Sequence, residues 1–133
     1  MPVTRILKVL TSVAVIGFVA GVASAQDARG LWLTQADKKD QVAQVESVPC
    51  GAALCGTIVK VFDGSGTQIS HPNVGKRVFW DMQPIGNGKY EGMAFVPAHN
   101  KNYRATMQVM GSEMLVKGCL GPVCQSQLWQ RVQ

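Results

Sequence analysis

Turn-forming residues recur at short intervals along this chain, and their spacing limits what it can fold into. After residue 30 they occur as "DGSG" at 63–66, "GNG" at 86–88, "PAHNKN" at 97–102 and "GS" at 111–112. The segments between them are short and show no helical periodicity, whereas turns at such intervals are typical of short strands. The sequence therefore predicts an all-β chain.

Eight segments are predicted as strands: 31–34, 41–48, 56–62, 77–82, 89–96, 102–110, 113–119 and 126–132. Alternation is clean in the segment 102–110, which places four residues on one apolar face: Tyr103, Ala105, Met107 and Val109. In the segment 78–82 the alternation of apolar and polar residues is less regular, and it predicts a shared face for Val78, Trp80 and Met82. One apolar face per strand favours an antiparallel meander, closed as a barrel or folded as a sandwich.

The first 25 residues carry the three-part pattern of a secretory signal peptide. Arg5 and Lys8 precede an apolar stretch at 9–22, and the small residues of "ASA" at 23–25 follow it. The apolar stretch is shorter than the roughly 20 residues that a spanning helix needs. We therefore expect a cleaved signal at 1–25, a single β-barrel domain at 26–133, periplasmic or secreted location, and no stable membrane insertion after cleavage.

The charge of the chain does not indicate a nucleic-acid partner. The whole chain has a formal net charge of +5 at pH 7, and removal of the predicted signal leaves 11 basic against 8 acidic residues, or +3. The basic residues are scattered, and the only runs are the pairs at 38–39 and 76–77. A nucleic-acid binder would need a clustered basic stripe with interleaved aromatic residues.

The four cysteines form two similar motifs, "CGAALC" at 50–55 and "CLGPVC" at 119–124. In an exported protein, four cysteines indicate a disulfide framework with three possible connectivities. A zinc site is disfavoured because no histidine lies near either pair, and a redox couple normally has a two-residue spacer. We therefore expect structural disulfides, no metal and no cofactor.

Two arguments bear on the connectivity of these cysteines. Bridges that close about 70 residues would contribute about 4 kcal/mol by chain entropy, against about 2 kcal/mol for local bridges. However, each motif has the character of a turn, and a turn brings its ends within the Cα separation of a disulfide. The local pairs Cys50–Cys55 and Cys119–Cys124 are therefore favoured.

The two ends of the predicted domain resemble those of a lipocalin-like barrel. The chain begins its first predicted strand with "GLW" at 30–32 and ends with "WQRV" at 129–132. In the lipocalin superfamily an arginine near the last strand covers the tryptophan of the first. The resemblance implies that Arg131 and Trp32 close the barrel through a cation–π contact.

The whole chain also resembles a bacterial family of exported proteins, the domain-of-unknown-function family 2147, from about residue 30 to 132. The matching motifs are "PCGAALCGTIV", "KYEGMAFVP", "NYRATM", "LVKGCLG" and "SQLWQRV". The chain departs from the family pattern at Val96, where an aspartate is usual, and at Lys60, where an aromatic residue is frequent. The resemblance implies a small lipocalin-like barrel and carries over structural residues only: Trp32, Cys50, Cys55, Cys119, Trp129 and Arg131.

No arrangement of residues predicts catalysis. His71 and His99 are the only histidines, the residue type that most often acts as a general base near neutral pH, and both occur in predicted loops, "SHPN" and "PAHN". Neither accompanies a nucleophile with a recognisable spacing. The protein is therefore expected not to be an enzyme, and no catalytic residue is assigned.

The sequence leaves two non-catalytic functions as hypotheses. The first is binding of a small apolar or amphipathic molecule, lipid-like and derived from the envelope, at a barrel mouth lined by inward-facing residues: Trp80, Tyr90, Tyr103 and Met107, with Met82. The same residues could instead simply fill the interior. The alternative function is binding of an envelope protein, for example as a periplasmic inhibitor of a lysozyme or protease, through the long polar loop at 66–76.

Overall fold

The computed structural model describes residues 12–15, 17 and 27–132, so most of the predicted signal peptide lies outside the described residues. The regular structure within the described residues consists of strands: β1 (Gly30–Leu33), β2 (Val42–Cys50), β3 (Ala53–Phe62), β4 (Gln68–Ile69), β5 (Arg77–Gly86), β6 (Lys89–Val96), β7 (Lys101–Met110), β8 (Glu113–Leu120) and β9 (Val123–Arg131). The prediction of an all-β chain is confirmed.

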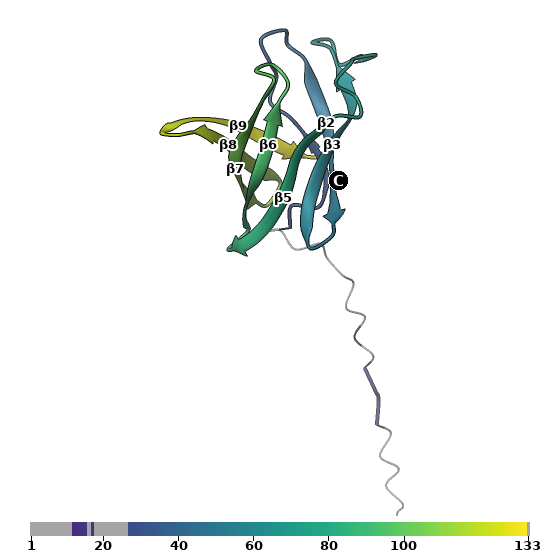
Figure 1. Cartoon of the computed structure of the whole chain (residues 1–133). Helices are drawn as coiled ribbons and strands as arrows, with labels where there is room; N and C mark the ends of the chain where they lie inside the picture. The colour runs from purple at the N-terminus through teal and green to yellow at the C-terminus, as the bar shows by residue number, and fades with distance from the viewer. Residues whose placement is uncertain (1–11, 16, 18–26, 133) are drawn as a thin grey trace, which may run out of the picture.

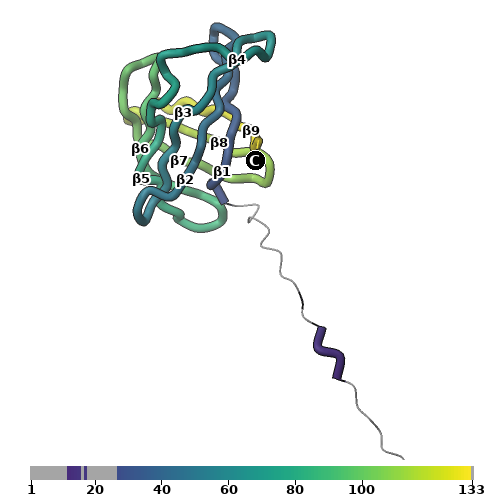
Figure 2. The backbone as a smooth tube through the Cα atoms, turned by 90° about the vertical axis from the view of Figure 1, so that its right-hand side faces the viewer, coloured from purple at the N-terminus to yellow at the C-terminus, as the bar shows by residue number. Residues whose placement is uncertain are grey.

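Eight of these strands close into an antiparallel barrel (Figures 1 and 2). The order around the wall is β2-β1-β9-β8-β7-β6-β5-β3, and β3 pairs with β2 to complete the circle. The two-residue strand β4 pairs with the last two residues of β3, Val61 and Phe62. The predicted count of about eight strands is therefore confirmed for the barrel wall, and β4 is an additional short pairing that the sequence did not indicate.

The antiparallel order gives the barrel two distinct ends. Strand β1 begins and β9 finishes at one end, here called the N-terminal end, together with the turns at 51–52, 87–88 and 111–112. The opposite end, here called the far end, carries the longer connections at 34–41, 63–76 and 97–100 and the tip of the β8–β9 hairpin. Figure 1 shows that this hairpin projects sideways from the barrel.

Side chains fill the described interior of the barrel. The largest fully buried ones are Trp32, Phe79, Met82, Met107 and Met114. They come from four different strands and belong to one continuous apolar cluster. Interiors of barrels this small are commonly filled in this way, because an eight-stranded wall encloses little more than its own inward side chains.

A β-bulge in β5 corrects the predicted face of Trp80. Phe79 pairs with the buried Ala94 and points inward, whereas Trp80 pairs with Met93 and is only half-buried. An extra residue then enters the strand at Asp81, whose φ of 53° is in the left-handed region. The bulge restores the inward direction at the buried Met82. The predicted shared face of Val78, Trp80 and Met82 is therefore wrong at Trp80.

Each disulfide joins two cysteines within one hairpin. The Cys50–Cys55 bridge has a Cα–Cα separation of 5.6 Å and spans the turn between β2 and β3. The Cys119–Cys124 bridge, with a Cα–Cα separation of 4.0 Å, joins directly opposed residues of β8 and β9. The structure thus contains the local pairing, and no cysteine of the chain is free.

Candidate functional site

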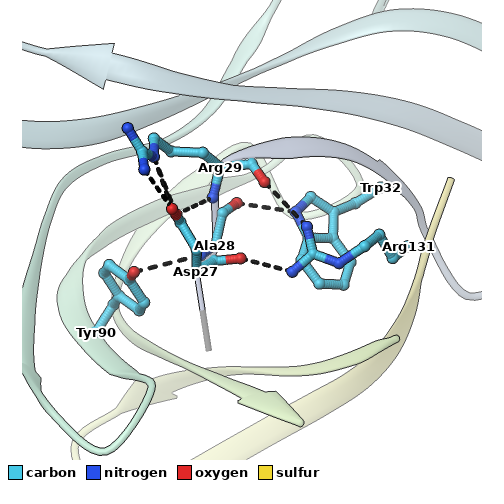
Figure 3. A network of polar contacts seen from close by, with 6 residues as sticks. All are labelled: Asp27, Ala28, Arg29, Trp32, Tyr90 and Arg131. Carbon is cyan, nitrogen blue, oxygen red and sulfur yellow. Dashed lines mark hydrogen bonds and ion pairs between the residues drawn. The ribbon is translucent and has the colours of Figure 1, made fainter. Parts of the chain in front are cut away.

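Residues 27–29 cross the N-terminal end before β1 and form a polar network with the end of β9 (Figure 3). Arg131 donates from Nη2 to the Asp27 carbonyl at 2.6 Å and from Nη1 to the Arg29 carbonyl at 3.0 Å. Its guanidinium carbon lies 4.3 Å from the ring centroid of Trp32, as the family resemblance implies. The Trp32 Nε1 in turn donates to the Ala28 carbonyl at 2.9 Å. Arg131 therefore holds the start of the fold against its end.

The local chain path depends on Gly30 and on a contact from β6. Gly30 has a φ of 120°, a conformation that residues with a side chain rarely adopt, and it redirects the chain from the crossing segment into β1. The buried Ala28 donates its N–H to the Tyr90 hydroxyl at 3.3 Å. The segment 27–29 is thereby fixed from β6 as well as from β9.

An ion pair lies at the outer edge of this network. The Asp27 carboxylate accepts hydrogen bonds from the Arg29 side chain, with Nε to Oδ2 at 2.9 Å, and from the Arg29 backbone N–H at 2.9 Å. The side-chain hydrogen bond from Arg29 is the largest effect and lowers the pKa of Asp27, whereas burial, the second largest, raises it. The backbone hydrogen bond and the charge of Arg29, and last the charge of Arg131, lower the pKa further. Asp27 therefore stays ionised further into the acid range than an ordinary aspartate.

This lowered pKa predicts an acid-sensitive contribution to stability. A carboxyl whose pKa is lower in the folded than in the unfolded state stabilises the fold above the unfolded value of about 3.9. The stabilisation is lost as the pH falls below that value and through the folded pKa. In urea unfolding across this range, Asp27→Asn should lose less stability on acidification than the wild type. Asp81→Asn, which alters an exposed aspartate outside the ion pairs of the described residues, should keep the wild-type pH dependence.

A solvent-open depression of about 310 Å³ lies beside the network, and we call it the N-terminal depression. Its apolar wall is made of Leu54, Met82, Pro49, Pro84, Ala52, Ala53 and the Gly51 backbone. Its polar rim is made of Asp27, Arg29 and Tyr90. An apolar wall beside a few fixed polar groups is the usual composition of a small-molecule site.

The structure separates the four residues predicted to line a ligand site. Tyr90 lines the N-terminal depression, whereas Met107 is fully buried in the core. Tyr103 lies near the far end, where its hydroxyl is 2.8 Å from Nδ1 of His99. Trp80 lies on the outer side of β5. Only Tyr90 of the four, together with the additional candidate Met82, contributes to the depression.

The sequence predicted Tyr90 of the rim, but it did not indicate Asp27 and Arg29 or one buried polar group on β2. Asp27, Ala28 and Arg29 directly precede the Gly-x-Trp motif, and that position was their only signal. Ser47 lies two positions before Pro49 on the same face of β2. Its side chain is 1% exposed, and its hydroxyl has no hydrogen-bond partner among the described residues.

A second, more polar depression of about 540 Å³ lies between β3 and the loop that follows β4. It is lined by Val59, Gln68, Ile69, Ser70, His71 and Val74. Within the described residues, no group of three or more histidine, cysteine, aspartate or glutamate side chains is placed to hold a metal ion. The described part of the chain also contains no helix of the length and apolarity needed to cross a bilayer.

The closed antiparallel barrel, with an arginine of its last strand stacked on a tryptophan of its first, defines a lipocalin-like protein. The chain belongs to the family described as "Uncharacterized protein conserved in bacteria (DUF2147)", which matches residues 30–131. This confirms the resemblance found in the sequence.

The fold is also similar to a solved structure from Helicobacter pylori, protein HP1028, which is described as belonging to the lipocalin family. The TM-score is 0.64 at 14% sequence identity, over 80% of this chain and 84% of that one. At this identity the likeness establishes the fold alone. A comparison with curated proteins gives no significant match.

Proposed function

We propose that this protein is a non-catalytic binder of a small apolar or amphipathic molecule, lipid-like and derived from the envelope, which it holds in the N-terminal depression. The observation that carries this proposal is the combination of an apolar wall and a polar rim in one hollow of about 310 Å³. Ligand pockets commonly range from about 300 to 1,000 Å³, so the ligand would be short.

Because the interior of the barrel is packed with side chains, a ligand bound at the end of the barrel is favoured over a ligand enclosed within it. Trp32, Phe79 and Met107 occupy the space in which a deep calyx would lie. Leu54 and Met82 belong to the same apolar cluster and also form the wall of the depression, where the core meets the surface. A ligand would therefore extend the core outward and would not replace it.

The wall and rim supply different parts of the binding free energy. Each buried methylene contributes about 0.8 kcal/mol, so a chain of about five methylenes gains about 4 kcal/mol before the costs of association. Even without those costs this gain would give only millimolar affinity, so the rim must contribute a substantial part of the binding free energy. The Arg29 side chain is 60% exposed and binds Asp27 through Nε and Nη2. A carboxylate or phosphate head group could accept hydrogen bonds from its remaining N–H groups.

The disulfides support a location outside the cytoplasm. All four cysteines are paired within hairpins, and membership of a bacterial family limits the oxidising compartments to the periplasm or the exterior. We infer that the protein works there after its predicted signal has been removed. Envelope-derived lipids and their breakdown products are the amphipathic molecules that such a compartment supplies.

An NMR titration with sodium octanoate tests the proposed site. Backbone amide shifts should change at residues 50–54, 82–83 and 90, which surround the depression. Ala53→Trp should fill the hollow and weaken octanoate binding by at least about tenfold, which is about 1.4 kcal/mol. Ala98→Trp makes the same change on an exposed loop at the far end and should leave binding unchanged. Equal binding by both variants, or shifts confined to other residues, would contradict the proposal.

A second candidate function, binding of an envelope protein through residues 66–76, is favoured by one observation. The loop is anchored to β3, because Gly75 donates to the Ile58 carbonyl at 2.7 Å and Ile58 donates to the Lys76 carbonyl at 3.0 Å. It nevertheless exposes 44% of Val74. A rigid loop with an exposed apolar residue suits insertion into a cleft. This function requires one stoichiometric partner whose binding is lost in Val74→Asp and retained in Ala53→Trp.

A further inference from the structure

The first seven of the nine residues of β9 have a strand on one side only. β8 pairs with β9 along its whole length, as far as Leu120 opposite Val123. β1 pairs with β9 only where Trp32 faces Arg131 and Leu33 faces Gln130. The seven residues of β9 before Gln130 therefore extend about 23 Å past the last pairing with β1, at about 3.3 Å per residue. This open stretch is one side of the projecting hairpin (Figure 1).

The direction of the backbone groups on this open side follows from two neighbouring hydrogen bonds. Arg131 donates its N–H to Ser112, next to β8, whereas Leu128 donates its N–H away from β8 to the Gln35 side chain at 3.1 Å. Backbone groups alternate in direction along a strand, so those of Cys124 and Ser126 also point away from β8. No strand of the described chain pairs with them there.

The open edge also lacks the features that usually prevent strands from associating. Exposed edges are commonly protected by charged residues, proline or bulges. The edge sequence "VCQSQLWQ" at 123–130 contains no charge and no proline, and its register with β8 is regular throughout. The side chain of Gln35 occupies one N–H group of this edge and leaves the two further out, on Cys124 and Ser126, free to pair.

We propose that this edge binds the same edge of a second copy of the chain, in an antiparallel pair with its two-fold axis at Gln125. In this register Cys124 lies opposite Ser126 of the second copy, and the two residues exchange both backbone hydrogen bonds. The same pair occurs again on the other side of the axis. Four hydrogen bonds then use the backbone groups of Cys124 and Ser126 from each copy, while the contact of Leu128 with Gln35 is retained.

The edge is complementary to itself, which favours a second copy over another kind of partner. A two-fold axis places identical surfaces together and closes after two copies. Gln125 faces Gln125 of the second copy, so two uncharged amides meet and can hydrogen-bond to each other. Lys117 lies on β8, where it is paired with Ser126. In the dimer the two β8 strands are three strand spacings apart, so the Lys117 residues of the two copies would be separated by at least about 14 Å. That exceeds the screening length of about 8 Å at physiological salt.

The Cys119–Cys124 disulfide prepares the hairpin for this association. It joins opposed residues of β8 and β9 immediately before the exposed tip, where Leu120 is 56% and Val123 is 67% exposed. A strand held extended before association loses less conformational freedom when it pairs. The interface is nevertheless small, so we expect a weak and reversible dimer.

Sedimentation velocity with charged variants of Gln125 tests both the dimer and its register. The wild-type protein should be monomeric at low micromolar concentration and dimerise at about 1 mM, as expected of a small interface. Gln125→Lys and Gln125→Glu each place like charges opposite one another, which should weaken the dimer by at least about tenfold. An equimolar mixture of the two variants places lysine opposite glutamate and should restore the dimer.

The controls separate this register from general effects of charge. Gln83→Lys and Gln83→Glu change another exposed glutamine, on β5, and should dimerise like the wild type. Three results would overturn the proposal: a wild-type monomer at about 1 mM, undiminished dimerisation of either Gln125 variant, or a mixture that stays monomeric. Circular dichroism of each variant checks that the barrel is folded in every sample of the experiment.

Discussion

Replacement of Trp32 by alanine should lower the free energy of unfolding by about 5 kcal/mol. Truncation of a buried tryptophan costs about 3–5 kcal/mol, and the stacked Arg131 and the hydrogen bond to Ala28 are lost as well. Small domains are stable by only about 5–15 kcal/mol, so a large fraction of the variant should be unfolded at room temperature. Urea unfolding followed by far-ultraviolet circular dichroism measures this loss.

Trp80→Ala is the matched control for this prediction, because it removes the same side chain from the outer side of β5. Trp80 is half-buried and pairs with Met93 outside the core, so we expect a loss below about 2 kcal/mol. Equal losses in the two variants would contradict the assignment of Trp32 to the closing contact and of Trp80 to the outer face.

Gly56→Ala should cost about 3 kcal/mol, since the site leaves no space for a methyl group. A Cβ atom at Gly56 would lie 2.1 Å from Cε1 of Phe79, whose ring is buried in the core and packs 6.3 Å from the ring of Trp129. The ring would have to move within a densely packed interior, which costs about 1–3 kcal/mol or more. Chemical denaturation of the variant measures the loss.

A double substitution identifies the cause of this loss. Phe79→Leu removes the ring atoms that the new methyl would meet, so Gly56→Ala combined with Phe79→Leu should cost at least about 1 kcal/mol less than the sum of the two single changes. Gly118→Ala is the control within a strand, because its nearest side-chain neighbour, Cβ of Tyr103, would lie at an ordinary 3.5 Å. Additive losses at 56 and 79, or an equal loss at Gly118, would show that the ring contact is not responsible.

The strand pattern could be predicted because turns and alternation are local properties of the sequence. All eight predicted segments lie inside an observed strand or extend at most one residue beyond it, although the segment 126–132 lacks the first three residues of β9. The local disulfides also followed from turn chemistry around Cys50 and Cys119. The contact of Arg131 with Trp32 joins opposite ends of the chain, so it came from the family resemblance and not from any local pattern.

The parts that could not be predicted depend on backbone irregularity or on contacts distant in sequence. The bulge at Asp81 reverses the alternation of β5, and nothing in "VFWDM" indicates a left-handed aspartate. The rim of the N-terminal depression combines residues 27–29 with Tyr90, more than 60 positions away. Gly92 lies against the bulge, because a Cβ atom there would be 2.6 Å from the carbonyl oxygen of Asp81. The sequence alone does not predict this contact, since a glycine in a strand does not reveal which backbone approaches it.

The contacts of Arg131 with the segment 27–29 have a consequence for how the chain is made. These hydrogen bonds join residues more than 100 positions apart, and β1 depends on β9 for one of its two neighbours. A chain that emerges with its N-terminus first, from a ribosome or through a translocation pore, therefore presents β1 long before the strand that covers it. Ring closure must therefore wait until β9 has emerged, and until then β1 lacks one of its two neighbours.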